Sequence, residues 1–312
     1  MAKGSELRTE VSLLVDHSGC AAGGIRTLLG LLIQELEQRG QRPQLVRGCW
    51  PALTPQLVVL GCSSPWAYGQ LLRHRLTYPK SPPRWVPCFH PPEHVRHPRK
   101  ARLARFALRW AQRLGIRVLV LSQQELQQLD TGRCRIISLG FGRTQPGPSG
   151  ANAAERPIDL VFLGRPTAQK GWPLFVGVVK RTGRPARAYV PFQPADTACL
   201  PVNLELMVAA SDAAVIRGLK GSKLLLLPAD YESFGFAQAE ALACGCCVPV
   251  LGDWPLWLGI PELDWRGLDG PDITYQVMTL LASDQTWMLL QRRQQQNWES
   301  RVERQAPRWI EQ

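Results

Sequence analysis

The sequence of 312 residues is long enough for two domains of ordinary size, each with its own hydrophobic core. Hydrophobic residues make up 45% of the chain, and no apolar run approaches the roughly 20 residues that cross a bilayer, which argues against an integral membrane protein. The nine cysteines include no CxxC pair, and the polar start MAKGSELRTE lacks the features of a signal peptide, so we expect a cytoplasmic protein.

The net charge of +12 is concentrated in the N-terminal half. Residues 1–150 contain 21 Lys and Arg against 8 Asp and Glu, whereas residues 151–312 contain 16 against 17. A basic excess of this kind attracts anionic partners. We therefore expect an anion to meet the N-terminal half of the chain.

The N-terminal half begins with the pattern of a Rossmann-like α/β unit. Val11–Val15 reads as an apolar strand, and Gly23 and Gly24 lie in the turn after it. Apolar spacing then predicts a helix over about residues 25–38. Glycines at such a turn remove side chains where the start of the helix approaches a ligand. Later elements of this half are predicted at Leu57–Leu60, Ala67–Arg75 (a helix), Trp85–Phe89 and Val118–Leu121.

His90 comes directly after the predicted strand Trp85–Phe89. The carboxyl ends of parallel strands form the edge where α/β sheets bind ligands, so His90 is a candidate site residue. His90 and His94 have the spacing of metal ligands on a helix, but the two prolines after His90 argue against a helix that presents both rings together. We expect no metal there.

The segment Arg96–Arg117 contains eight Lys and Arg and no acidic residue. Apolar residues at spacings of three and four predict a helix whose apolar stripe faces the core, because the helix leads directly into the next strand. The stripe consists of Leu103, Phe106, Ala107, Trp110 and Leu114. The basic face is either ordinary solvated surface or a peripheral docking surface for anionic lipid headgroups or an anionic acceptor. Nucleic acid is not expected, because no recognised binding motif accompanies the charge.

A linker rich in Gly, Pro, Ala and Ser spans Gly142–Pro157. We expect an N-terminal acceptor domain of residues 1–150, a C-terminal donor domain of residues 151–296 and a closing helix over residues 297–312. Within the second domain, residues 182–222 carry few signals beyond a predicted strand at Ala186–Val190.

Two predictions concern packing in the second domain. Cys244, Cys246 and Cys247 lie in a tight turn between a helix and a strand, where small residues pack well, so we expect a structural role. The glutamine-rich segment Gln291–Gln296 is expected on the surface of a helix.

Two loops of the second domain carry the clearest chemistry. A strand at Asp159–Leu163 is followed by a loop that contains Arg165 and Lys170, which together would neutralise a diphosphate. Further on, the stretch 223–252 reads as strand, loop, helix and strand, with Glu232 in the loop and Glu240 in the helix. On one helix these two carboxylates would lie about 12 Å apart along the axis, a span that suits ribose, diphosphate and hexose.

The start of the helix in the 223–252 stretch is predicted to bind an anion. Phe234 and Gly235 fall where free backbone N–H groups and the positive end of the helix dipole point outward. Carboxylates on either side of such a helix start fit a ligand with hydroxyls at both ends and phosphate in the middle. A nucleotide sugar is such a ligand.

The pattern P-x-x-x-E-S-F-G-x-x-x-x-E-A-L-A-C-G-x-x-V in this stretch resembles the donor-binding signature of retaining GT-B glycosyltransferases, in particular glycosyltransferase family 4 (glycosyl transferases group 1). The resemblance implies an α/β fold of two Rossmann-like domains with parallel sheets facing across a cleft. A C-terminal helix crosses back to the first domain in this family, and Asn297–Ile310 resembles it.

The resemblance also implies residue roles. In this family the first Glu of the motif contacts sugar hydroxyls and the second holds the ribose, which carries over to Glu232 and Glu240. The catalytic set implied is His90, Arg165, Lys170 and Glu232. Donor-binding positions implied are Gly23, Gly24, Gly164, Ser233, Phe234, Gly235 and Glu240, with Gly171 completing the matched element G-R-x-x-x-x-K-G.

The implied reaction is front-face transfer of a sugar, with a hexose expected, from a nucleotide-diphosphate sugar to an unidentified acceptor. The basic N-terminal half is consistent with an anionic or lipid-linked acceptor. No D-x-D motif is present, so no metal or other cofactor is expected, and cations with a helix N-terminus would stabilise the leaving group. A phosphorylase-like or epimerase activity is a further enzyme alternative. The second alternative is a non-catalytic homologue that acts as a binding or scaffold subunit. It stays open because Leu139 and Gly142 depart from the family pattern and residues 182–222 lack its glycines.

Overall fold

The computed structural model describes residues 10–15, 24–46, 51–61, 64–87, 98–121, 135–136, 153–229, 232, 234–252 and 257–304. Contacts between Cα atoms divide the chain into two compact units. Unit 1 comprises residues 1–140 with the last six residues, and unit 2 comprises residues 141–306.

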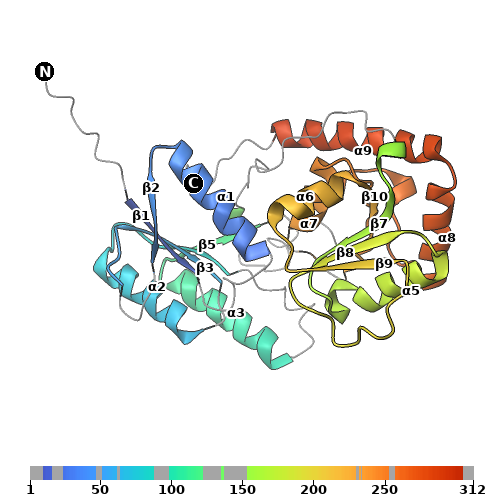
Figure 1. Ribbon diagram of the computed structural model, residues 1–312. Helices are drawn as coiled ribbons and strands as arrows, with labels where there is room; N and C mark the ends of the chain where they lie inside the picture. Colours follow the sequence, from blue (N-terminus) through green and yellow to red (C-terminus); the bar gives the residue numbers. More distant parts are fainter. Residues whose placement is uncertain are drawn as a thin grey trace, which may run out of the picture. The chain divides into compact units, whose positions relative to one another are not determined.

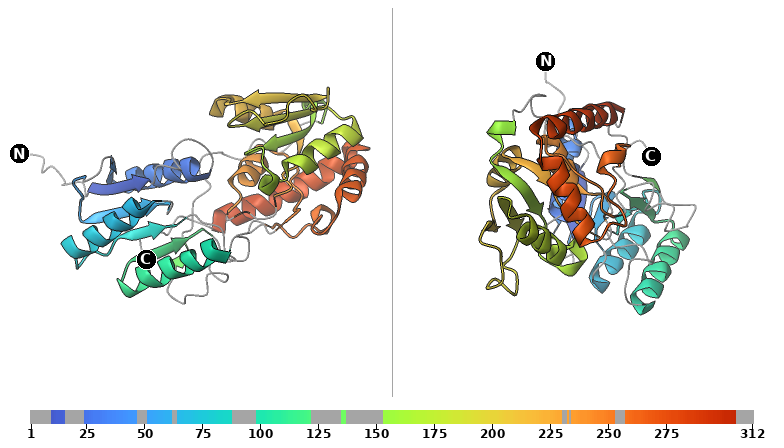
Figure 2. Two further views of the ribbon diagram at one scale, coloured as in Figure 1. Left: turned by 90° about the horizontal axis from the view of Figure 1, so that it is seen from below. Right: turned by 90° about the vertical axis from the view of Figure 1, so that its right-hand side faces the viewer.

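Unit 1 is built on a parallel sheet with the strand order β2-β1-β3-β4-β5-β6. Its strands are β1 (Glu10–Val15), β2 (Arg42–Val46), β3 (Gln56–Leu60), β4 (Arg84–Val86), β5 (Arg117–Val120) and β6 (Arg135–Ile136). Its helices are α1 (Gly24–Gln38), α2 (Pro65–Thr77) and α3 (Pro98–Arg113). Helix α1 covers one face of the sheet, and α2 and α3 lie on the other (Figures 1 and 2). Strands of such a sheet are buried on both faces, which explains why β1 and β3 are nearly continuous apolar runs.

The face of helix α3 that packs against the core differs from the one that the sequence predicted. Its buried residues are Ala107, Leu108 and Ala111, with Trp110 and Leu114 partly buried beside them. The small alanines let the helix approach the sheet closely, so the contact centres on them rather than on the larger side chains of the predicted stripe.

Leu103 and Phe106 do not join this contact. They are 66% and 65% exposed, so their predicted burial in the core is wrong. An exposed apolar pair therefore lies near the middle of α3.

Unit 2 has a second parallel sheet, with the strand order β10-β7-β8-β9. Its strands are β7 (Ile158–Leu163), β8 (Ala186–Val190), β9 (Leu204–Val208) and β10 (Ser222–Leu225). Its helices are α5 (Trp172–Thr182), α6 (Asp212–Lys220), α7 (Phe236–Ala243), α8 (Gly270–Leu281) and α9 (Asp284–Arg304), with short 3-10 turns η3 (Ala153–Glu155), η4 (Ala168–Lys170) and η5 (Pro261–Leu263). Helix α5 lies on one face of the sheet, and α6 and α7 lie on the other (Figure 1).

Beyond β10 the sheet continues through isolated parallel bridges. Leu224 pairs with Cys247, and Val250 pairs with Asp264. The expected second strand of the 223–252 stretch is therefore reduced to these bridges.

Strand β9 and helix α6 fill the segment that carried few sequence signals. Ser211 caps α6 by accepting a hydrogen bond from Ala214 N at 3.3 Å. A serine followed by Asp212 is a helix-start signal, so α6 was readable from the sequence.

Helix α9 corrects one prediction on packing. Gln291, Gln294 and Gln295 are buried, so the expectation that this glutamine-rich segment lies only on a helix surface is wrong. The amide of Gln294 bonds both backbone groups of Val248, accepting from its N–H at 2.8 Å and donating to its carbonyl at 2.7 Å. A side chain on α9 thus pairs with the backbone as a neighbouring strand would.

The expected boundary at residue 297 falls inside α9, which runs without a break to Arg304. Trp298 is buried, and the Asn297 amide donates to the Leu258 carbonyl at 2.9 Å. Among the described residues, no helix has both the length and the apolar character that crossing a membrane requires.

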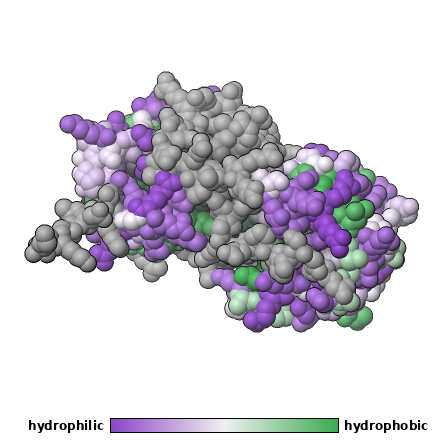
Figure 3. Space-filling view, turned by 90° about the horizontal axis from the view of Figure 1, so that it is seen from above, coloured by the Kyte–Doolittle hydropathy of each residue, from purple (hydrophilic) through white to green (hydrophobic). Residues whose placement is uncertain are grey.

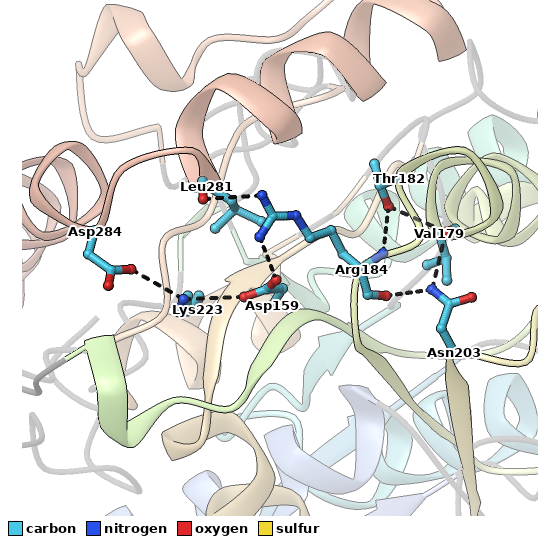
Figure 4. Close-up of polar contacts among 8 residues, drawn as sticks. All are labelled: Asp159, Val179, Thr182, Arg184, Asn203, Lys223, Leu281 and Asp284. Carbon is cyan, nitrogen blue, oxygen red and sulfur yellow. Dashed lines mark hydrogen bonds and ion pairs between the residues drawn. The ribbon is translucent and has the colours of Figure 1, made fainter.

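The amino end of the unit 2 sheet holds a connected chain of charged residues (Figure 4). Asp159, buried on β7, pairs with Arg184 at 3.1 Å and with Lys223 at 3.3 Å. Lys223 also pairs with Asp284 at the start of α9, and Arg184 donates to the Leu281 carbonyl. The network therefore joins β7 and β10 to the α8–α9 turn.

Candidate functional site

The first predicted loop leaves β7 at the carboxyl edge of the unit 2 sheet. Gly164 donates from its backbone N–H to Tyr189 on β8 at 3.1 Å, which keeps the start of the loop against the sheet. Arg165 is exposed, and its guanidinium donates to the Gln169 side chain at 3.2 Å. Lys170 ends η4, so both predicted cations lie on one short loop.

Gly171 fixes this loop against the second predicted loop. Its φ of +69° is in the left-handed region, where residues with a side chain are strained. A Cβ at this position would overlap the backbone carbonyl of Pro228, which follows β10. Glycine is therefore required for the close approach of the two loops.

The two loops meet in an ion pair between Lys170 and Glu232. Lys170 Nζ donates to Glu232 Oε1 at 2.5 Å, across 62 positions of sequence. The two side chains are only 17% and 13% exposed, so water screens the pair less than it screens a surface pair. The structure thus brings together a cation predicted to meet phosphate and a carboxylate predicted to meet sugar hydroxyls.

Helix α7 begins beside this pair with the geometry of an anion site. Gly235 is its N-cap residue at φ +85°, and its carbonyl accepts from Ala239 N at 2.9 Å. Phe234 is buried and packs against Phe236 with ring centroids 4.7 Å apart. The first backbone N–H groups of a helix have no partner within it, so they are available to phosphate oxygens.

Glu240 lies further along α7, on its less buried side. Gln238, Ala239, Ala241 and Leu242 form the buried side of the helix, whereas Glu240 is half-buried. Glu232 and Glu240 therefore lie before and within the same helix, as the sequence predicted.

Two polar atoms at the site were not singled out by the sequence. Thr167 Oγ1, in the loop between Arg165 and Lys170, and Gln238 Oε1, in the first turns of α7, are buried without a hydrogen-bond partner among the described residues. Burying a polar group without a partner costs about 1–3 kcal/mol, so such atoms are candidates for ligand contacts. Both fall at unspecified (x) positions of the two motifs, so the motifs did not identify them.

The C-terminal end of α7 is held by Arg156, a buried residue that the sequence analysis also missed. Its guanidinium donates to the carbonyls of Ser222 at 2.6 Å and Cys244 at 2.8 Å, and it lies over the Trp287 ring at 5.6 Å. Arg156 thereby anchors α7 at the end opposite the site, where the helix dipole favours a positive charge.

The cysteines behind α7 are packing residues, as expected. Cys244, Cys246 and Cys247 are buried and free. Burial raises the pKa of Cys244 to about 11 and that of Cys246 to about 12, and it raises the pKa of Cys247 as well. The thiols are therefore neutral at physiological pH, which disfavours reactivity and metal binding.

Several predicted site positions lie outside the described residues. These are Gly23, His90 and Ser233, together with the loop that contains Leu139 and Gly142. Gly24 is described and begins α1. The other predicted residues all belong to unit 2: Gly164, Arg165, Lys170, Glu232, Phe234, Gly235 and Glu240. Among them, the structure brings Lys170 and Glu232 into direct contact.

No protein-family model and no curated protein matches this chain. Among solved structures, sucrose-phosphate synthase from Thermosynechococcus elongatus is similar at 15% identity with a TM-score of 0.74, and 94% of each chain is covered. HepE from Anabaena, solved with UDP and glucose, is similar at 14% identity with a TM-score of 0.66, covering 93% of this chain and 95% of that one. An alpha-glucosyltransferase solved with UDP and a 13-mer DNA containing an HMU base is similar at 10% identity with a TM-score of 0.65, again covering 93% and 95%.

These similarities and the two parallel α/β units define the fold class. The chain has the GT-B fold of glycosyltransferases, so the fold class expected from the sequence is confirmed.

Proposed function

We propose that the protein is a retaining, metal-independent glycosyltransferase of the family 4 type. It transfers a hexose from a nucleotide-diphosphate sugar to an acceptor. The observation that carries the proposal is the Lys170–Glu232 pair, formed by two loops that only a glycine at position 171 allows to meet. A cation suited to bind phosphate and a carboxylate suited to bind sugar hydroxyls lie in contact here. This arrangement fits one ligand that carries both a phosphate and a sugar.

Each residue has a distinct task in this proposal. Arg165, Lys170 and the N-terminus of α7 bind the diphosphate, Glu232 orients the sugar hydroxyls, and Glu240 holds the ribose. On donor binding, Lys170 exchanges its carboxylate partner for phosphate, and Glu232 turns to the sugar. The preorganised positive groups then stabilise negative charge that grows on the leaving diphosphate.

The proposed transfer step is the front-face transfer that the family resemblance implies. The bond between the anomeric carbon and the phosphate oxygen breaks, and a bond from the acceptor oxygen forms on the same face of the sugar. The acceptor proton passes to the departing phosphate oxygen, so no separate carboxylate base is needed. His90 approaches the sugar as positive charge develops at the anomeric carbon.

The donor is proposed to be a UDP-sugar. Two proteins with similar structures, HepE and the alpha-glucosyltransferase, were solved with UDP. The acceptor is proposed to be anionic or lipid-linked, because the basic excess lies in the N-terminal half. We place the reaction in the cytoplasm, and we do not expect a nucleic-acid acceptor.

A panel of UDP-, GDP- and ADP-sugars tests the proposal by thermal shift and by release of the nucleoside diphosphate. One donor class at about 100 times its dissociation constant should stabilise the protein by about 2.7 kcal/mol and should be hydrolysed slowly. A metal chelator should leave that hydrolysis unchanged.

The scaffold alternative predicts a different outcome. No sugar nucleotide would then be hydrolysed, and Lys170→Met would change nothing in the panel. Arg187 and Glu205, an exposed ion pair at 2.6 Å between β8 and β9, supply matched controls in the same unit. Arg187→Met and Glu205→Gln should keep wild-type donor binding.

A further inference from the structure

Helix α3 carries an exposed surface that combines apolar and cationic side chains. Leu103 and Phe106, at 66% and 65% exposed, are neighbours on the helix at a spacing of three. We call the set Arg102, Leu103, Phe106, Arg109 and Arg113 the α3 surface. Burial of Ala107, Leu108 and Ala111 holds the helix on the sheet without any contribution from this surface.

The cationic members of the α3 surface lie on the same side as Phe106. At 3.6 residues per turn, Arg102, Phe106, Arg109 and Arg113 fall within about 60° of one another around the helix axis. All three arginines are exposed, and within the part of the chain that the structure describes none has an ion-pair partner. The sequence of α3 contains no acidic residue that could neutralise them.

The exposed apolar side chains of α8 have different surroundings. Tyr275 and Met278 on α8 are 69% and 40% exposed, but that helix carries Asp272 and no Lys or Arg. On the face drawn in Figure 3, the described surface is mostly hydrophilic and its hydrophobic residues form separate patches. Apolar and cationic groups thus coincide on α3 and not on α8.

We propose that the α3 surface binds the surface of an anionic lipid membrane. The arginines meet headgroup phosphates, and Phe106 with Leu103 enters the boundary between headgroups and acyl chains, as the apolar face of an interfacial helix does. A surface that bound only phosphate, such as nucleic acid, would use the arginines and leave the apolar pair exposed. The apolar pair therefore decides in favour of lipid.

Binding to vesicles tests the proposal without any sugar nucleotide, so it is independent of the proposed function. Full-length protein is floated with vesicles of phosphatidylcholine alone and of phosphatidylcholine mixed with phosphatidylglycerol. Wild-type protein should bind the mixed vesicles and not the neutral ones, and added salt should weaken binding.

Two multiple variants separate the contributions of charge and apolar contact. Removing the charges in R102Q/R109Q/R113Q should weaken binding by about 100-fold, since each arginine near an anionic surface contributes roughly fivefold. Removing the apolar pair in L103Q/F106Q should weaken it by about tenfold. Glutamine is chosen because it keeps helix propensity, and circular dichroism verifies that each variant folds.

Matched controls come from unit 2. Y275Q/L289Q changes two exposed apolar residues, and K180Q/K220Q/R292Q removes three exposed charges. Both should bind like the wild type.

Three results would overturn the proposal: equal binding to neutral vesicles, unchanged binding by L103Q/F106Q, or an equal loss in the controls. Tight binding to DNA that survives L103Q/F106Q, with no binding to vesicles, would instead assign the surface to nucleic acid. Concentration-dependent dimers that L103Q/F106Q abolishes, again without vesicle binding, would assign it to a second copy of the chain.

Discussion

The charged residues at the amino and carboxyl edges of the unit 2 sheet differ in how many ion-pair partners they have. At the amino edge, Asp159, Arg184, Lys223 and Asp284 form a connected chain of ion pairs in which Asp159 and Lys223 each have two charged partners. At the carboxyl edge, Lys170 and Glu232 form a single pair and Arg165 is exposed. A charge with several partners has little freedom to exchange them, whereas a single pair beside exposed cations exchanges readily with a ligand. We therefore expect the first arrangement to support the fold and propose that the second supports binding.

The largest expected effect on this comparison comes from Asp159→Ala. The substitution leaves Arg184 and Lys223 without their buried partner, and breaking a buried pair in this way costs about 3–5 kcal/mol. Chemical denaturation should show this loss in the free energy of unfolding. Asp284→Ala is the control, because that side chain is 62% exposed and its pair should be worth less than about 1 kcal/mol. Similar costs for both variants would mean that the network does not act through Asp159.

At the carboxyl edge, Lys170→Met and Glu232→Gln should act on catalysis rather than on folding. Loss of a group that stabilises the transition state costs about 100-fold in kcat/KM. The free energy of unfolding should change less than it does in Asp159→Ala, because each of these variants breaks one ion pair rather than two. A variant that loses stability and retains kcat/KM would reverse the distinction between the two edges.

Gly171→Ala tests whether the carboxyl edge depends on the close approach of its two loops. The added Cβ combines left-handed strain with overlap at the Pro228 carbonyl, so destabilisation of about 2–3 kcal/mol and weaker donor binding are expected. Gly183→Ala is a matched control, since Gly183 has φ +63° and open space around it. It should cost only about 1 kcal/mol and leave donor affinity unchanged. Equal effects of the two variants on donor affinity would show that the contact with Pro228 does not matter.

The smallest expected effect concerns the neutral thiols behind α7. The folded pKa of Cys244 is about 11, above its ordinary value of 9.0, so the unfolded chain loses this proton first as pH rises. The contribution of the neutral Cys244 thiol to the free energy of unfolding is therefore complete below pH 9, and it is smaller by about 1.4 kcal/mol at pH 10. Unfolding free energies of wild type and Cys244→Ala, measured at pH 8, 9 and 10, should differ in slope. Parallel slopes would show that burial does not shift this group.

The parts of unit 2 that sequence reasoning anticipated have local causes. The strand at Ala186–Val190 and the helix of the second motif follow from apolar runs, glycines and caps that act within a few residues. The occurrence of Arg165, Lys170 and Glu232 on neighbouring loops follows from the order of strands, which the motifs already imply.

The features that sequence reasoning missed depend on contacts far along the chain. The Gln294 amide bonds a residue 46 positions away, and Arg156 reaches Cys244 across 88 positions. No periodic pattern encodes such partners. The orientation of α3 was mispredicted for a related reason, since the small alanines at 107 and 111 set its contact with the sheet and hydrophobicity alone does not rank them above Phe106.

The Gln294 amide also determines how the unit 2 sheet ends. Beyond β10, both backbone groups of Val248 are occupied by this side chain, and those of Val250 are taken by Leu263 and Trp265. Among the described residues, Val248 and Val250 therefore offer no free backbone groups to another polypeptide, which protects this part of the sheet against edge-to-edge aggregation. Helix α9 provides that protection with a residue whose sequence context resembled ordinary helix surface.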